Sequence, residues 1–273
     1  MSRIKTAVIL GAGMGSRLNN ITEDKIPKGL LNVNGKTLVE RSIEKLRSLG
    51  IENIYIVTGH LNEFYDELAK DTNYIHTKKN RRYRSTGSME SLAVLENEIN
   101  EDFLLLESDL IYEVYALVKV INFNEDDCVL LSGRTNSGDE CYVEVRDENL
   151  FKISKDINDI EKVYGELVGI SKISLDLYKE MLKEYKNKKS DFYDYEAIEG
   201  YYVNGNKCKY DYDCDNKKAN KWDYEEVIFD VARKRKIGYF KIEDLLWGEI
   251  DDDKHLERIN NLIIPKLEKE KFN

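Results

Sequence analysis

The chain has 273 residues, with 42 Lys or Arg against 52 Asp or Glu, which gives a formal net charge of −10. This acidic balance argues against a surface built for nucleic acid or for an anionic membrane, and no apolar run reaches the roughly 20 residues of a membrane-spanning helix. The length supports a sizeable core and fits one large α/β domain or two small ones.

The first expected element is a buried strand over residues 7–10, which runs into a glycine-rich turn. Gly11, Gly13 and Gly15 stand at alternate positions after the apolar run. Glycines leave backbone N–H groups without side-chain cover, so an anion can approach them closely. The turn is therefore a candidate phosphate-binding loop.

Two cations follow this turn. Arg17 offers a planar fork of donors that suits phosphate, and Lys28 follows Pro27, whose ring stiffens the loop. A dinucleotide fingerprint fails because Ser16 replaces its third glycine, and no Gly-Lys-Ser/Thr of a Walker-A loop follows. The alternative is a purely structural glycine turn followed by an arginine on the surface. We interpret strand, turn and both cations as a site for a triphosphate.

The next elements alternate. We expect a helix over 36–49, a strand over 54–57, a short helix that Asn62 caps, and a strand at 74–75. Strands that alternate with helices indicate a parallel sheet with crossover helices.

A basic, polar loop at 80–88 breaks this pattern, and Ser88 then caps a further helix. One interpretation is a solvated loop with ordinary helix-cap chemistry. Beside a nucleotide site, Thr86, Gly87 and Ser88 are instead candidates for reading a base edge.

The apolar strand at 103–106 leads into Glu107-Ser108-Asp109. An acid after a buried strand lies at the carboxyl end of the sheet, where α/β proteins bind ligands. Magnesium prefers hard oxygen ligands, so Asp109 is a candidate metal ligand. Starting a turn is the alternative role for this aspartate.

The second half of the chain mixes its elements. Expected are a helix at 114–121, strands at 129–132, 140–145, 150–154 and 163–173, a helix after Ser174, a helix at 223–235, a strand at 237–242 and a last helix after Asp251. Residues 186–221 are irregular and suggest a lid, an insertion or an oligomer contact. We see no repeat and no linker, so residues 1–273 are expected to form a single domain.

The cysteines and histidines show no ligand spacing. Because no export signal precedes the first strand, we expect a cytoplasmic protein with reduced thiols. These thiols are Cys128, Cys141, Cys208 and Cys214.

The G-x-G-x-G-S-R-L turn followed by P-K-x-L resembles the signature of sugar-nucleotide pyrophosphorylase-type nucleotidyltransferases. With Glu107-Ser108-Asp109 and the segment 247–251, Trp-Gly-Glu-Ile-Asp, the chain resembles small bacterial enzymes that activate phosphorylated or phosphonylated alcohols and amines. These are the phosphocholine and 2-aminoethylphosphonate cytidylyltransferases, and segments 85–92 and 165–172 look more like the phosphonate branch. The resemblance implies a Rossmann-like, GT-A-type α/β fold. Its central sheet is mostly parallel, flanked by helices, with an antiparallel extension.

By that resemblance, the reaction is Mg²⁺-dependent transfer of CMP from CTP to a small phosphonate or phosphate monoester, with release of pyrophosphate. Arg17 and the glycine turn would bind the β- and γ-phosphates, Lys28 would bridge the α-phosphate and the acceptor, and Asp109 with Asp251 would hold Mg²⁺. Asp251 also has a helix-start alternative, and Glu249, Asp252 and Asp253 lie near it. The nucleotide-binding candidates are Leu10, Gly11, Ala12, Gly13, Met14, Gly15, Ser16, Thr86, Gly87 and Ser88.

The acceptor's amine calls for a carboxylate or an aromatic face. Glu166, Tyr224 and Glu225 are the candidates, each with a structural alternative. The remaining alternatives are a sugar- or polyol-phosphate nucleotidyltransferase using UTP, dTTP or CTP, and a nucleotide-binding relative without activity. The expected partners are CTP and the acceptor, and the sequence is compatible with a homodimer.

Overall fold

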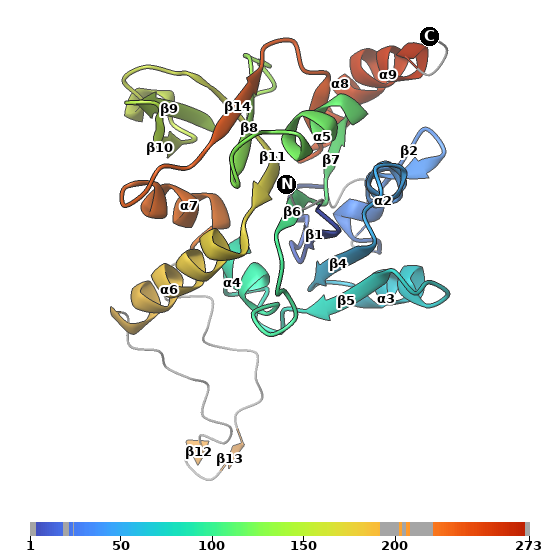
Figure 1. Cartoon of the computed structure of the whole chain (residues 1–273). Coiled ribbons are helices and arrows are strands. Elements are labelled where there is room, and N and C mark those ends of the chain that lie inside the picture. Colours follow the sequence, from blue (N-terminus) through green and yellow to red (C-terminus); the bar gives the residue numbers. More distant parts are fainter. Residues whose placement is uncertain are drawn as a thin grey trace.

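The computed structural model describes residues 4–18, 22–23, 25–191, 202–203, 206–207 and 221–270. A mixed nine-stranded sheet crosses the molecule (Figure 1). Its main order is β10-β9-β11-β6-β1-β4-β5, and β8 joins β11 to the outer strand β14. The expected α/β fold is confirmed.

The N-terminal part of the sheet is parallel. β1 (Thr6–Gly11) lies between β4 (Asn53–Thr58) and β6 (Phe103–Glu107), and β5 (Ile75–Lys79) pairs with β4. The crossover helices are α2 (Leu38–Ser48), α3 (Asn62–Ala69) and α4 (Ser88–Ala93). Since parallel strands share a direction, their carboxyl ends meet at one edge of the sheet.

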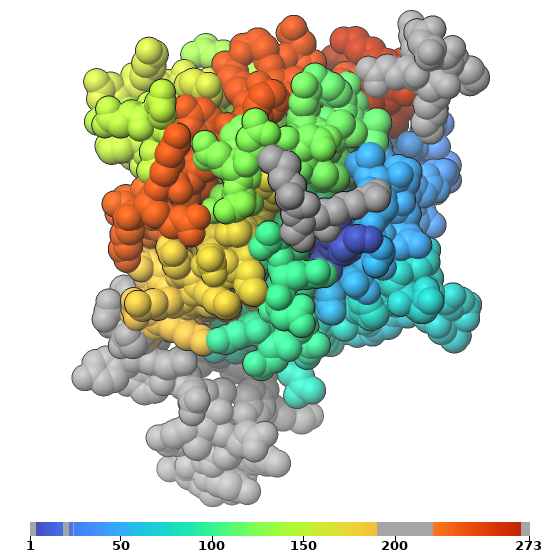
Figure 2. Space-filling view, viewed as in Figure 1, coloured from blue at the N-terminus to red at the C-terminus, as the bar shows by residue number. Residues whose placement is uncertain are grey.

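The extension begins where β11 (Gly165–Ile173) pairs antiparallel with β6. Its other strands are β8 (Cys128–Ser132), β9 (Tyr142–Arg146), β10 (Asn149–Ser154) and β14 (Tyr239–Ile242). Helices α5 (Val114–Ile121) and α7 (Tyr224–Ala232) pack against it, and α6 (Leu175–Asp191) packs against α7. In the space-filling view, the blue-to-cyan N-terminal part lies on the right and the yellow and orange segments of the extension lie on the left, with green segments, which include α5 and β8, between them (Figure 2).

Small elements complete the chain. A two-stranded sheet joins β7 (Leu110–Tyr112) to β15 (Trp247–Glu249), and another joins β2 (Asn32–Val33) to β3 (Lys36–Thr37). The pair β12 (Tyr202–Val203) and β13 (Asn206–Lys207) is separate. Short 3-10 turns cover Ser16–Leu18, Lys28–Leu30 and Ile157–Asp159, and the chain continues through α8 (Asp253–Arg258), a π-helical turn (Ile259–Ile263) and α9 (Ile264–Glu270).

The core follows from strand alternation. Because successive side chains of a strand point to opposite faces, Val8 and Leu105 join the cluster on one face of the sheet, whereas Ile9 and Leu104 join the cluster on the other. Burial on both faces explains why β1 and β6 read as continuous apolar runs.

Two expected helix caps differ in the structure. Asn62 is the first residue of α3 rather than its cap, and its side-chain amide donates to Asp66 (2.7 Å). Ser88 is the first residue of α4, after Gly87. Most of 186–221, the expected lid, lies outside the described residues, as do Cys208 and Cys214, while residues 186–191 continue α6. No helix in the described ranges is long and apolar enough to cross a bilayer.

Candidate functional site

A cleft of about 470 Å³ opens at the carboxyl ends of the parallel strands. All of the predicted nucleotide-binding residues line it, together with the predicted catalytic and metal residues. This set comprises residues 10–17, Lys28, residues 86–88, Asp109 and Asp251. The structure therefore brings together segments that are far apart in the sequence.

The glycine turn forms one wall of this cleft. Gly15 adopts the left-handed conformation with φ of 63°, which glycine reaches without steric cost. A Cβ atom on Gly13 would meet no heavy atom within 4 Å, so its backbone borders open space. This wall can offer N–H groups to an anion without any rearrangement of neighbouring side chains.

Lys28 lies on the floor of the cleft, and its side chain is 13% exposed. Its ammonium group contacts the carboxylates of Asp109 and Asp251 and lies 3.7 Å from Glu249 Oε1. Burial alone would lower the pKa of Lys28, but the charges of these carboxylates outweigh burial and raise that pKa above its usual value. Lys28 is therefore a permanent cation at the centre of the site.

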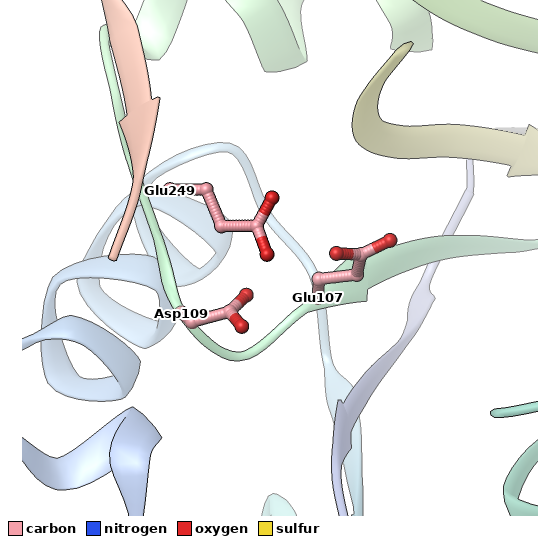
Figure 3. Close-up of side chains that lie close together, drawn as sticks. All are labelled: Glu107, Asp109 and Glu249. Atoms are coloured by element: carbon pink, nitrogen blue, oxygen red, sulfur yellow. The ribbon is translucent and has the colours of Figure 1, made fainter. Parts of the chain in front are cut away.

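Three acids surround a common point near Lys28. Oxygens of Glu107, Asp109 and Glu249 all lie within 4.8 Å of one another, and Figure 3 shows their carboxylates converging from β6, from the turn before β7 and from β15. Among the described residues, buried Asp109 Oδ1 and Asp251 Oδ2 have no hydrogen-bond partner. Such an oxygen-only set suits a hard divalent cation, so the residues present fit a metal.

The sequence predicted Asp109 and Asp251 as the metal ligands, but the cluster in the structure contains two other acids besides Asp109. Glu107 and Glu249 join Asp109 in the cluster, whereas Asp251 Oδ1 contacts Lys28 and Arg17 Nη2 (2.9 Å). The missed signal was a repeated Glu-x-Asp, at 107–109 and 249–251. Residues two apart on an extended segment project to the same side.

The close approach of these buried acids shifts their pKa values. Burial and the charge of Asp109 raise the pKa of Glu107 to about 7, although the Tyr224 hydroxyl donates to Glu107 Oε1 (2.8 Å). Burial and the charges of Asp109 and Glu107 also raise the pKa of Glu249. For Asp251, burial opposes ionisation, but Lys28 holds its pKa below the usual range. Positive charge added to this cluster would thus be stabilised.

Arg17 reaches across the mouth of the cleft. Its guanidinium contacts Asp139 (2.8 Å) as well as Asp251, and its side chain is 57% exposed. Asp139 in turn lies 3.4 Å from Lys155 Nζ. An incoming nucleotide phosphate would therefore compete with Asp139 for Arg17, while Lys155 lies on the side of the small pocket.

The predicted base-reading loop is tied down by its own hydrogen bonds. Ser88 donates to Asp223 Oδ1 through its backbone N–H (2.9 Å) and its hydroxyl (3.0 Å), and the hydroxyl accepts from Tyr224 N–H (2.9 Å). A Cβ on Gly87 would lie 2.3 Å from the Trp222 carbonyl oxygen. Ser88 and Gly87 thus join α4 to α7. Their contact with a base stays a prediction.

A second, smaller pocket of about 70 Å³ adjoins the cleft, and Glu107 and Glu225 line both. Two of the predicted acceptor-binding residues, Glu166 and Glu225, line this pocket, but Tyr224 is buried outside it. Glu166 Oε2 already accepts from the backbone N–H and hydroxyl of Thr135 (2.9 and 2.7 Å).

Sequence reasoning missed three basic residues of the small pocket, Lys155, His255 and Arg258. Lys155 follows β10, whereas His255 and Arg258 share α8, and no motif connects the two segments. The position of α8 beside Gly248 and Asp251 brings His255 and Arg258 to this wall.

Comparison with known proteins supports the resemblance. Residues 7–164 match the model of the MobA-like NTP transferase domain. The chain is 26% identical over 214 residues to the CTP:phosphoglutamine cytidylyltransferase of Campylobacter jejuni, which covers 72% of this chain and 84% of that protein. It is 31% identical over 173 residues to the bifunctional protein GlmU of Methanococcus maripaludis, covering 63% of this chain but only 39% of that longer protein. With the Haemophilus influenzae choline-phosphate cytidylyltransferase it shares 36% over 107 residues, which is 38% of this chain and 44% of that enzyme.

Solved structures show the same fold. The inositol-1-phosphate CTP transferase from T. maritima superposes with a TM-score of 0.72 at 19% identity, covering 98% of this chain and 96% of that one. The CTP:phosphocholine cytidylyltransferase from Streptococcus pneumoniae gives a TM-score of 0.69 at 19% identity, covering 95% and 99%.

Proposed function

This chain belongs to the MobA-like NTP transferase family, and on that premise we propose that it is a cytidylyltransferase. It transfers CMP from CTP to a small phosphonate or phosphate monoester that bears an amine, and it releases pyrophosphate. The names of the Campylobacter and Haemophilus relatives favour CTP and a phosphorylated small molecule.

One observation carries the proposal. Lys28 and the cluster of Glu107, Asp109 and Glu249 lie where the large cleft and the small pocket meet. The cleft has room for a nucleoside triphosphate, and the pocket has room for a few non-hydrogen atoms. This arrangement suits a reaction that joins a large donor to a small acceptor.

The chain's own residues supply positioning and charge. An acceptor oxygen attacks the α-phosphorus, a new P–O bond forms, and the bond from the α-phosphorus to the bridging oxygen breaks as pyrophosphate leaves with the electron pair. The acceptor oxygen is already ionised at neutral pH, so no general base is needed. Lys28 holds the α-phosphate and the acceptor together, and Arg17 with the glycine turn binds the departing phosphates.

We assign Mg²⁺ to these acids, because their carboxylates supply only oxygen ligands and Mg²⁺ prefers oxygen ligands. Glu107, Asp109 and Glu249 would hold it, with Asp251 Oδ2 available as a further ligand. When bound, it supplies charge for the phosphates of both substrates.

The small pocket argues against a sugar phosphate as acceptor. About 70 Å³ is the volume of roughly two water molecules in the liquid, which is less than a hexose requires. A sugar- or polyol-phosphate transferase remains an outcome of the test below.

The test measures pyrophosphate release with each of four NTPs and Mg²⁺, paired with 2-aminoethylphosphonate, phosphocholine, phosphoethanolamine or glucose 1-phosphate. Release with CTP and an amine-bearing acceptor is the expected result. Release only with UTP or dTTP and glucose 1-phosphate would contradict it. Nucleotide binding by calorimetry, without release from any pair, would favour a relative without activity.

A further inference from the structure

The small pocket contains nitrogen donors to which the proposed reaction assigns no role. His255 and Arg258 line it from α8, and neither of them lines the cleft. The inference below rests on the proposed function, because it concerns the acceptor of the same reaction.

Arg258 is half-buried beside this pocket. Within the described ranges, its guanidinium has neither an ion-pair nor a hydrogen-bond partner, in a protein with an excess of acids. A Cβ atom on Gly248 would lie 3.1 Å from Arg258 Nη1, so the glycine gives the guanidinium its room. A half-buried guanidinium without a carboxylate partner is a preformed place for an anion.

His255 adds a second donor. Its Nδ1 accepts a hydrogen bond from the backbone N–H of Asp251 (3.2 Å). The neutral ring therefore carries its proton on Nε2. The side chain is 6% exposed and lines the pocket, and no described residue accepts a hydrogen bond from Nε2.

The opposite sign is present as well. Glu140, Glu166 and Glu225 also line this small volume. The acceptor's phosphate must lie at Lys28 to react, so it does not account for a second anion position at Arg258. A ligand that pairs with both the arginine and the glutamates therefore carries an anionic group and an ammonium group at the end that enters the pocket.

We propose that the acceptor is a phosphorylated or phosphonylated amino acid, whose carboxylate binds Arg258 and His255 and whose ammonium faces the glutamates. The pocket volume of about 70 Å³ suits a group of a few non-hydrogen atoms, such as an amino-acid head group. The attacking phosphate stays at Lys28, so the reaction itself is unchanged.

The test uses acceptors that differ only in the carboxylate. O-phosphoserine is compared with phosphoethanolamine, and 2-amino-3-phosphonopropionate with 2-aminoethylphosphonate. We expect kcat/KM with CTP to be about tenfold or more higher for the carboxylate-bearing member of a pair, as ~1.4 kcal/mol of charge-assisted binding gives tenfold. Arg258→Gln should remove this preference and leave kcat/KM for phosphoethanolamine within about twofold.

Arg233→Gln is the matched control, since the side chain of Arg233, at the C-cap of α7, is 71% exposed and does not line the pocket. Equal or faster turnover of phosphoethanolamine by the wild type would overturn the inference but leave the cytidylyltransferase proposal standing. An equal loss for both acceptors in Arg258→Gln would assign the arginine a structural role.

A binding measurement covers the case without turnover. Calorimetry of O-phosphoserine and phosphoethanolamine against the full chain, with a non-hydrolysable CTP analogue present, reports the same preference. Tighter binding of O-phosphoserine, lost in Arg258→Gln, supports the proposal. Equal binding of the two ligands overturns it.

Discussion

The cleft and the small pocket are built in opposite ways. One wall of the cleft is a continuous stretch, residues 10–17, and it presents mainly backbone groups. The pocket is assembled from the side chains of separate segments, around residues 107, 135–141, 155, 166–169, 225 and 247–258. A wall of backbone groups recognises the phosphates that all nucleoside triphosphates share. A pocket lined by side chains from separate segments can change its ligand specificity through single substitutions.

The largest effect is expected where the two regions meet. Lys28→Gln removes the cation that contacts Asp109 and Asp251 and that we assign to both substrates. We expect kcat to fall by ~10³, measured as pyrophosphate release with CTP. Lys36→Gln, on an exposed lysine paired with Glu44, is the control. A loss confined to the KM of one substrate would place Lys28 in one region only.

The second effect concerns the acidic cluster. Asp109→Asn should lower kcat by ~10² and weaken Mn²⁺ binding, read by calorimetry, because it removes a carboxylate charge from the cluster. Asp253→Asn changes an exposed acid at the start of α8 and serves as the comparison. Undiminished Mn²⁺ affinity in Asp109→Asn would remove this residue from the metal site.

A third experiment separates the regions directly. Lys155 lines only the small pocket. Lys155→Gln should therefore raise the acceptor KM by about tenfold, equivalent to ~1.4 kcal/mol, with the KM for CTP unchanged. Lys152→Gln, on β10 of the same hairpin, provides the control. Parallel changes in both KM values would mean that the two regions are not independent.

The smallest effect tests the backbone wall. A methyl group at Gly13 meets no protein atom, so Gly13→Ala should leave the melting temperature unchanged but raise the KM for CTP about fivefold, or ~1 kcal/mol. Gly35 has φ of 84° in a remote turn. Gly35→Ala should instead destabilise the fold by about 1–2 kcal/mol with no change in KM. A stability loss in Gly13→Ala would show that the turn is structural.

The contrast between consecutive and dispersed residues explains which features could be predicted from the sequence. Apolar strands such as β1 and β6 were recognisable because both faces of them are buried, and the glycine turn was recognisable because its residues are consecutive. Glu107 and Glu249 were missed as a set, since only the pairing of β7 with β15 brings them together. Arg258 was out of reach because its position depends on how α8 docks, which no local pattern encodes.

The pairing of β7 with β15 also sets an order of assembly. Residues 110–112 are translated long before residues 247–249, yet each contributes one strand of the small sheet that brings Glu249 beside Asp109. A nascent chain that has emerged only as far as residue 240 already has its glycine turn, Lys28 and Asp109, but lacks Glu249 and Asp251. Almost the whole polypeptide must therefore leave the ribosome before the acidic cluster can form, and a prematurely terminated product would carry only two of its three acids.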